Sequence, residues 1–126
     1  MSPAGQPARL LVVEDEAALA KVLQMRLQLE GFEVDVAGDG AEAMDLIRAR
    51  RPDLVVCDLM MPVMDGIEVT RTIKGDPELR AIPILILSAL KSEKEMEELR
   101  RLGAEAFASK PYDGKALTAQ IRELLA

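Results

Sequence analysis

The sequence predicts an α/β domain built on a doubly wound, mostly parallel sheet of five βα units. Uninterrupted apolar runs of strand length alternate along the chain with stretches of helical periodicity, which is the pattern of repeated βα units. The 126 residues, 49% of them apolar, suffice for one buried core without disulfides or a structural metal. We therefore expect a single domain of this class and exclude a multidomain enzyme within this chain.

Five segments have the features of strands, and their patterns indicate where each lies in the sheet. Residues 9–13, 54–57 and 84–87 are apolar without alternation, as is typical of strands covered by helices on both faces. Residues 33–37 alternate polar with apolar side chains and residues 105–108 form a short mixed run, so both are expected at the edges. With the second and fifth strands outside, the predicted order is 2-1-3-4-5, the flavodoxin-like arrangement.

The first two helices have recognisable ends. Residues 17–30 repeat apolar positions, and Gly31 follows where a glycine often ends a helix. The repeated positions are Leu19, Val22, Leu23 and Leu27. The second helix follows the Asp39-Gly40 turn and stops before Pro52, because a proline disfavours helical backbone at the residue before it.

The three later helices are indicated by their caps and charges. Asp65 and Glu68 have the spacing of a capping box that opens the third helix. A similar box begins the fourth helix at Ser92, and this helix runs to Gly103 with acidic residues early and arginines late, as the helix dipole favours. The fifth helix spans about residues 114–125 and has an apolar stripe of its own.

Composition and charge exclude several classes of function. Sixteen Lys and Arg residues against twenty-two Asp and Glu residues leave a net charge of −6, so this domain is not expected to hold DNA by itself. Without any histidine, the sequence has no His-based catalysis and no His-ligated metal site. Its single cysteine, Cys57, cannot form an internal disulfide. The first residues, MSPAGQPA, have neither the basic start nor the apolar run of a signal peptide, and no apolar run has membrane-spanning length. A cytoplasmic location is therefore expected.

Polar side chains directly follow four of the five predicted strands. The carboxyl ends of parallel strands share one edge of a sheet, and doubly wound sheets bind ligands there, at the switch point between the first and third strands. Taken singly, each of these residues has an ordinary structural explanation, such as a helix cap or a loop charge. Together they predict a functional site. They are Glu14 and Asp15 after the first strand, Asp58 after the third, Ser88 after the fourth and Lys110 after the fifth.

These residue types suit a divalent cation and phosphoryl chemistry. Crowded carboxylates raise one another's pKa unless a cation lies between them, and oxygen ligands without His or Cys favour Mg²⁺ or Mn²⁺. A carboxylate beside such an ion can act as a nucleophile and form an aspartyl-phosphate, and Asp58 is the central candidate. Lys110 would then place a positive charge on the phosphoryl oxygens, and Ser88 would donate a hydrogen bond to them.

Four segments, in this order and at this spacing, resemble the receiver domain of two-component response regulators. They are LLVVEDE, VVCDLMMPVMDG, ILILSA and FASKP, and the resemblance covers about residues 9–125. The chain is similar to single-domain, chemotaxis-type regulators. The resemblance implies a receiver domain over residues 9–126, preceded by a flexible segment at residues 1–8, with no output domain in this chain.

The resemblance assigns roles to the residues at the strand ends. It implies that Asp58 accepts a phosphoryl group from a phosphohistidine of a sensor histidine kinase or a histidine phosphotransfer protein. The residue at the Asp15 position binds Mg²⁺ directly in this family, the residue at the Glu14 position assists through water, and the backbone carbonyl at the Met60 position completes the protein ligands. A cis Lys110–Pro111 peptide bond is implied as well.

The resemblance also implies a conformational switch. In the family, the hydroxyl at the Ser88 position moves toward the phosphoryl group and the aromatic ring at the Phe107 position swings inward. This changes the surface of the fourth helix, fifth strand and fifth helix, which binds a downstream protein target. The chain is expected to be a monomer or a weak phosphorylation-dependent dimer, without direct contact to nucleic acid or membrane. Met60 and Leu90, two positions beyond Asp58 and Ser88, are expected to hinder an attacking water and lengthen the phosphoryl lifetime.

Three other functions fit parts of the pattern. A haloacid-dehalogenase-type phosphatase would have a second Asp two residues after its nucleophile, where this chain has Met60, and it would need a cap domain. A nucleotide-binding protein would have a glycine-rich loop after the first strand, which is acidic here. A receiver-like interaction scaffold that is never phosphorylated stays open as an alternative, although it would not need the acids, hydroxyl and lysine. The preferred hypothesis is a switch that is no enzyme beyond its own phosphorylation and dephosphorylation.

Overall fold

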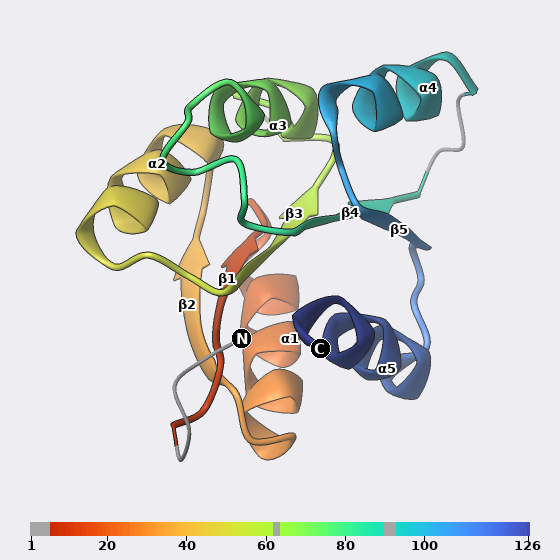
Figure 1. Ribbon diagram of the computed structural model, residues 1–126. Coiled ribbons are helices and arrows are strands. Elements are labelled where there is room, and N and C mark those ends of the chain that lie inside the picture. The colour runs from red at the N-terminus through yellow and green to blue at the C-terminus, as the bar shows by residue number, and fades with distance from the viewer. Residues whose placement is uncertain (1–5, 62–63, 90–92) are drawn as a thin grey trace.

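The computed structural model describes residues 6–61, 64–89 and 93–126, and within them strands and helices alternate strictly (Figure 1). This alternation was predicted, and each predicted strand lies within one residue of the observed one. In chain order the elements are β1 (Arg9–Val13), α1 (Ala17–Leu29), β2 (Glu33–Ala37), α2 (Gly40–Ala49), β3 (Leu54–Asp58), α3 (Gly66–Lys74), β4 (Ile84–Ser88), α4 (Glu93–Leu102), β5 (Ala106–Ser109) and α5 (Gly114–Leu125).

The strands form one parallel sheet in the order β2-β1-β3-β4-β5, which confirms the predicted topology. Val13 of β1 lies opposite Cys57 of β3, and the next residue of β3, Asp58, lies opposite Leu87 of β4. The register therefore brings the carboxyl ends of the three central strands together at one edge.

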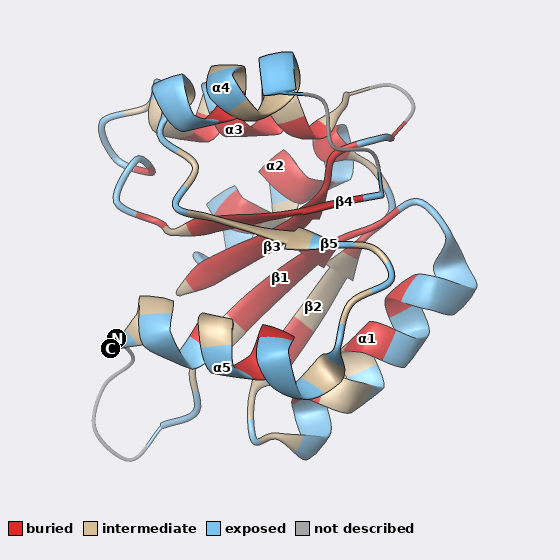
Figure 2. Ribbon diagram, turned by 90° about the vertical axis from the view of Figure 1, so that its right-hand side faces the viewer, coloured by how far each residue is buried: buried red, intermediate tan, exposed pale blue. Residues whose placement is uncertain are grey.

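The helices cover the sheet on both faces, with α2, α3 and α4 on one side and α1 and α5 on the other (Figure 1). Strands β1, β3 and β4 are buried over almost their whole length, whereas β5 is only half-buried (Figure 2). Alternate residues of the central strands supply the two cores: Val55 faces the core beneath α2, α3 and α4, and Val56 faces the core beneath α1 and α5. The sheet is thus a rigid platform for its carboxyl edge.

Helix α1 buries only part of its repeated apolar positions. Leu19 and Val22, two of these positions, are 46% and 61% exposed. The buried residues are Ala20, Leu23 and Leu27, at i, i+3 and i+7. The helix offers two neighbouring apolar stripes, and it packs on the one that contains the small side chain of Ala20.

The helix ends largely follow the sequence signals. Gly31 and Gly103 have φ values of 98° and 112°, the left-handed backbone that favours glycine after a helix. The Asp65 carboxylate accepts a 2.9 Å hydrogen bond from the backbone N–H of Glu68, so Asp65 caps α3 as predicted. Ser92, the predicted cap of α4, lies outside the described residues. Among the helices of the described ranges, none combines the length and apolarity required to cross a bilayer.

Candidate functional site

The end of β1 brings two carboxylates to the edge of the sheet. The backbone N–H of Glu14 donates to the carbonyl of Ala37 at 3.0 Å and extends the pairing with β2 by one residue. Glu14 is only 4% exposed, whereas Asp15 is exposed. The Glu14 carboxylate also accepts a 3.1 Å hydrogen bond from the backbone N–H of Glu16. One acid is therefore held in the protein and the next faces solvent.

Asp58 ends β3 and is 5% exposed. The chain then turns back at once: Leu59 donates its N–H to Leu87 of β4 at 2.9 Å, and its carbonyl accepts from Gly66 at 2.9 Å. A Cβ on Gly66 would lie 2.9 Å from the Asp58 carbonyl oxygen, so only glycine allows α3 to begin so close to this backbone. Contacts on two sides thus fix the position of Asp58.

Lys110 joins the ends of three strands. Its backbone N–H donates to the carbonyl of Ser88 at 3.0 Å, and its peptide bond to Pro111 is cis. Its ammonium Nζ lies 2.7 Å from Oε1 of Glu14 and 3.3 Å from Oδ1 of Asp58. The charge of Lys110 is therefore shared between the acids that follow β1 and end β3.

Three carboxylates converge beside this ammonium group. Glu14, Asp15 and Asp58 each offer an oxygen, and these oxygens lie within 4.8 Å of one another. A donor set made only of oxygen atoms, with one residue open to solvent for waters, fits a hard divalent cation such as Mg²⁺. The geometry thus agrees with the chemistry inferred from the residue types.

Burial and the neighbouring charges give the three ionisable groups different pKa values. Burial opposes ionisation of Glu14, but the hydrogen bonds from Lys110 and from the Glu16 N–H outweigh it and lower the pKa of Glu14. Burial and the charge of Glu14 raise the pKa of Asp58 despite the opposing effect of Lys110. Burial opposes the charge of Lys110, but its bonds with Glu14 and Asp58 prevail and raise its pKa. Lys110 is thus held as a cation, and the Asp58 carboxylate is poorly stabilised.

The predicted switch residues lie on β4 and β5. Ser88 is the last residue of β4, is 6% exposed, and lies one position beyond Leu87, the partner of Asp58 across the sheet. Phe107 lies opposite Ile86 and packs half-buried against the core beneath α4. Ser88 therefore ends the strand beside that of Asp58, and Phe107 lies on the adjacent strand β5.

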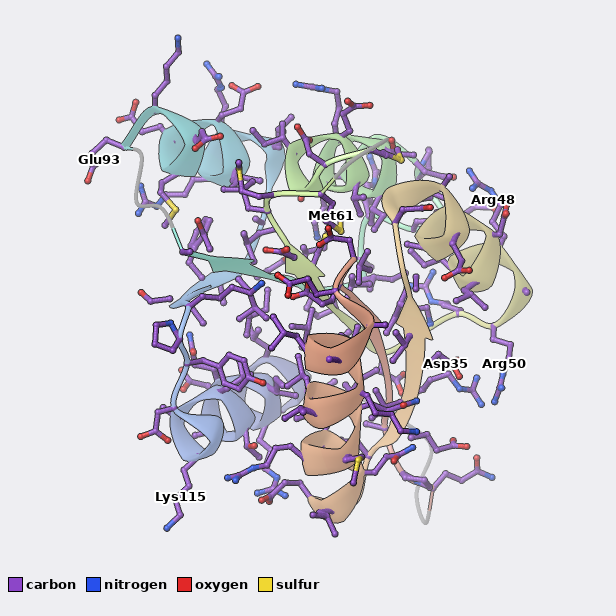
Figure 3. All side chains as sticks on the ribbon, turned by 180° about the vertical axis from the view of Figure 1, so that it is seen from behind. Asp35, Arg48, Arg50, Met61, Glu93 and Lys115 are labelled. Atoms are coloured by element: carbon purple, nitrogen blue, oxygen red, sulfur yellow. The ribbon has the colours of Figure 1, made fainter. Side chains whose placement is uncertain are left out.

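The loop after Asp58 exposes one methionine and buries the next. Met60 is 56% exposed, whereas Met61 is 9% exposed and lies beside the end of β3 (Figure 3). The backbone N–H of Met60 favours the ionised form of the Asp58 carboxyl and so opposes the rise of its pKa. Leu90, the other residue predicted to affect phosphoryl lifetime, lies outside the described residues.

An apolar pocket of about 560 Å³ beside the acids is not evident from the sequence. It adjoins Glu14 and Lys110, and its apolar wall consists of Leu19, Leu23, Leu87, Ala89, Pro111 and Tyr112. Burial raises the pKa of the Tyr112 phenol, so this ring is neutral at physiological pH. The position of Tyr112 directly after the Lys110–Pro111 bond is the one sequence signal for its place beside the site.

Sequence comparisons agree with this arrangement. Residues 10–122 match the family model described as "Response regulator receiver domain". The chain is similar to Response regulator MprA of Mycobacterium sp. (strain KMS), with 41% identity over 119 residues that cover 94% of this chain and 51% of that protein. It is also similar to DNA-binding response regulator MtrA of Mycobacterium tuberculosis (strain CDC 1551 / Oshkosh), with 40% identity over 93% of this chain and 50% of that protein. The chain thus spans about half the length of these curated relatives.

Solved structures show the same architecture. The chemotaxis protein CheY4 of Vibrio cholerae superposes with a TM-score of 0.89 at 29% identity, over 94% of this chain and 98% of that one. The receiver domain of a signal transduction histidine kinase from Syntrophus aciditrophicus gives a TM-score of 0.87 at 33% identity, over 94% and 89% of the two chains. Both are similar to this chain over nearly its whole length.

Proposed function

Because the chain belongs to the response regulator receiver domain family, we propose that it is a phosphorylation-dependent switch of a two-component phosphorelay. The phosphoryl group comes from a phosphohistidine of a sensor histidine kinase or a histidine phosphotransfer protein, and Asp58 accepts it. The chain catalyses only its own phosphorylation and dephosphorylation. The observation that carries this proposal is the Lys110 ammonium, which lies between Glu14 and Asp58 at the carboxyl edge of the sheet.

The chemistry follows from the position of Asp58. One of its carboxylate oxygens attacks phosphorus, the phosphorus–nitrogen bond of the donor breaks, and the imidazole leaves with the electron pair and takes a proton. The raised pKa of Asp58 reflects a carboxylate with little stabilisation, which favours its use as a nucleophile. Lys110 is close enough to move its charge from the carboxylate to a phosphoryl oxygen as the bond forms.

The proposed Mg²⁺ site lies at the same carboxyl edge of the sheet. Asp15 and Asp58, with the backbone carbonyl of Met60, are the proposed protein ligands of Mg²⁺, and Glu14 assists through water; Mn²⁺ can replace Mg²⁺. When bound, the ion neutralises charge on the phosphoryl oxygens and orients them for in-line transfer. Glu14 keeps its hydrogen bond from Glu16 in this arrangement and therefore stays ionised.

The readout is a change of the surface formed by α4, β5 and α5. The new phosphoryl oxygens need hydrogen-bond donors, and the Ser88 hydroxyl moves toward them. The half-buried ring of Phe107 then moves inward, and a downstream protein recognises the altered surface. Pairing of Ser88 with Ser109 across β4 and β5 supports this coupling, because both strands end at the site.

The phosphoryl lifetime is assigned to the apolar residues that flank the site. Met60, exposed next to Asp58, hinders the approach of a hydrolytic water. Leu90, two positions beyond Ser88 in the sequence, is proposed to act with it. A Met60→Asn or Leu90→Glu variant should therefore lose its phosphoryl group faster than the wild type, and unchanged dephosphorylation in both would contradict this assignment.

Incubation with acetyl phosphate and Mg²⁺ tests the proposed function. Intact-protein mass spectrometry should show one added phosphoryl group that hydroxylamine removes, as expected for an acyl-phosphate. Chelation of Mg²⁺ and the Asp58→Asn substitution should each abolish it. Asp45→Asn is the matched control, because Asp45 is exposed on α2, away from the carboxyl edge, and carries the same charge.

The same experiment separates the alternatives. Continuous turnover of a phosphoester without a stable adduct would indicate a phosphatase. The absence of any Mg²⁺-dependent adduct would overturn the proposal in favour of a scaffold that is not phosphorylated. An adduct that persists in Asp58→Asn would refute the choice of acceptor residue.

A further inference from the structure

A cation lies over the ring of the predicted switch aromatic. The guanidinium of Arg100 on α4 lies 5.3 Å from the centroid of the Phe107 ring on β5. This separation is within the range in which a guanidinium is attracted to the face of an aromatic ring. Arg100 follows Leu99, which is completely buried, so the base of Arg100 is fixed by the packing of α4.

The backbone of Phe107 is held from two sides. Residue Phe107 pairs with Ile86 of β4, and its carbonyl accepts a 3.2 Å hydrogen bond from the side-chain amide of Gln120 on α5. Its movement as a switch is therefore a rotation of the side chain, with little displacement of the strand. The contact with Arg100 opposes this rotation, because the ring can keep it only while it stays beside α4.

The other charged contacts of this region involve different residues. Glu98 of α4 pairs with Arg71 of α3 and with its neighbour Arg101. The ammonium of Lys74 lies 2.6 Å from the carboxylate of Glu105, the residue just before β5, and this ion pair holds the start of that strand. These ion pairs attach α4 and β5 to the rest of the molecule, whereas Arg100 contacts the ring itself.

We propose that Arg100 is a positioning residue that holds Phe107 beside α4 in the unphosphorylated chain. Phosphorylation must break this contact before the ring can turn inward. Arg100 therefore helps to determine the population of the inward ring in the unphosphorylated chain. This inference rests on the proposed function, in which Phe107 moves on phosphorylation. Loss of the contact should raise the population of the inward ring about two- to five-fold, which corresponds to about 0.5–1 kcal/mol.

The chain offers a direct probe of this equilibrium. It contains two phenylalanines, so labelling with 4-fluorophenylalanine gives two ¹⁹F resonances. The ring centroid of the other phenylalanine, Phe32, lies 5.6 Å from the guanidinium of Arg122. Phe32 is distant from Phe107 because it lies on the side of β2. It serves as an internal reference. Relaxation dispersion of the Phe107 resonance detects μs–ms exchange with the minor ring state, and data recorded at two magnetic fields are fitted for its population.

Four proteins give the test: the wild type, Arg100→Ala, Arg100→Lys and Lys94→Ala. Arg100→Ala should increase the inward population about two- to five-fold and speed phosphorylation by acetyl phosphate by a similar factor. Arg100→Lys should restore much of the wild-type behaviour, because an ammonium group also binds a ring face. Lys94→Ala removes the same charge from an exposed position of α4 and should change neither measurement.

Three results overturn the inference, each by a different route. If acetyl phosphate modifies Asp58 and changes the Phe107 resonance, but Arg100→Ala has the wild-type population, the role of Arg100 is refuted and the proposed switch stands. If phosphorylation of Asp58 leaves the Phe107 resonance unchanged in the wild type, the proposed movement of the ring fails, and the role of Arg100 fails with it. A Lys94→Ala effect equal to that of Arg100→Ala would refute the inference in favour of a general effect of charge.

Discussion

Replacing Lys110 by methionine tests what holds the acidic site together. Methionine keeps an unbranched apolar stem but removes the ammonium that lies 2.7 Å from Glu14 and 3.3 Å from Asp58. Glu14 is 4% exposed, so its carboxylate would keep few partners besides the N–H of Glu16. Hydrogen bonds to charged groups contribute about 1.5–3 kcal/mol each, and the Lys110 side chain is 20% exposed. We therefore expect a loss of about 2 kcal/mol.

Urea unfolding at pH 7, without divalent ions, measures this loss. The pH is suitable because the raised pKa of Lys110 and the lowered pKa of Glu14 leave both groups fully ionised there. Addition of Mg²⁺ should stabilise Lys110→Met more than the wild type, since the ion meets the same carboxylates without a competing cation.

Lys115→Met is the matched control, because Lys115 projects into solvent from α5 (Figure 3). Its free energy of unfolding should stay within about 0.5 kcal/mol of the wild-type value. A Lys110→Met protein as stable as this control would refute the view that the ammonium stabilises the buried acids.

Four further substitutions probe the site and the core. Asp58→Asn should raise the free energy of unfolding at pH 7 without metal, because the raised pKa of Asp58 means that wild-type stability falls as pH rises above the ordinary value of 3.8. In a pH series of urea titrations, the stability advantage of Asp58→Asn should therefore vanish below that pH. Gly66→Ala should cost about 1–3 kcal/mol in the same assay and slow phosphorylation, because its Cβ would press on the backbone of Asp58; a neutral effect would contradict the close approach. In thermal unfolding, Leu23→Ala should cost about 2–5 kcal/mol and Val22→Ala less than about 0.5 kcal/mol, and equal losses would argue against the observed rotation of α1.

The main features of the fold could be predicted because they depend on local patterns. Unbroken apolar runs mark strands that are covered on both faces, and the alternating run at residues 33–37 marks an edge. The placement of Glu14, Asp58 and Lys110 at one edge follows from the same patterns. Any parallel sheet with these strands would bring these residues to its carboxyl side.

Side-chain packing could not be predicted in the same way. In α1, both Val22 and Leu23 belong to apolar stripes of helical period, and only the fit of the helix against the sheet selects Leu23 for burial. The position of Arg100 has a similar origin. Its place near the end of α4 suggests only a favourable interaction with the helix dipole, whereas its contact with Phe107 depends on how α4 packs beside β5.

The sequence by itself therefore determined the order of the elements, the strand order and the set of residues that share the carboxyl edge, since hydrophobic period and chain direction are properties of short segments. Only the tertiary structure decided that Lys110 bonds to both Glu14 and Asp58 and that Arg100 covers Phe107. These contacts depend on separations of a few ångströms between segments far apart in the chain. Sheet register, helix rotation and loop path set such separations together, and no local pattern encodes them.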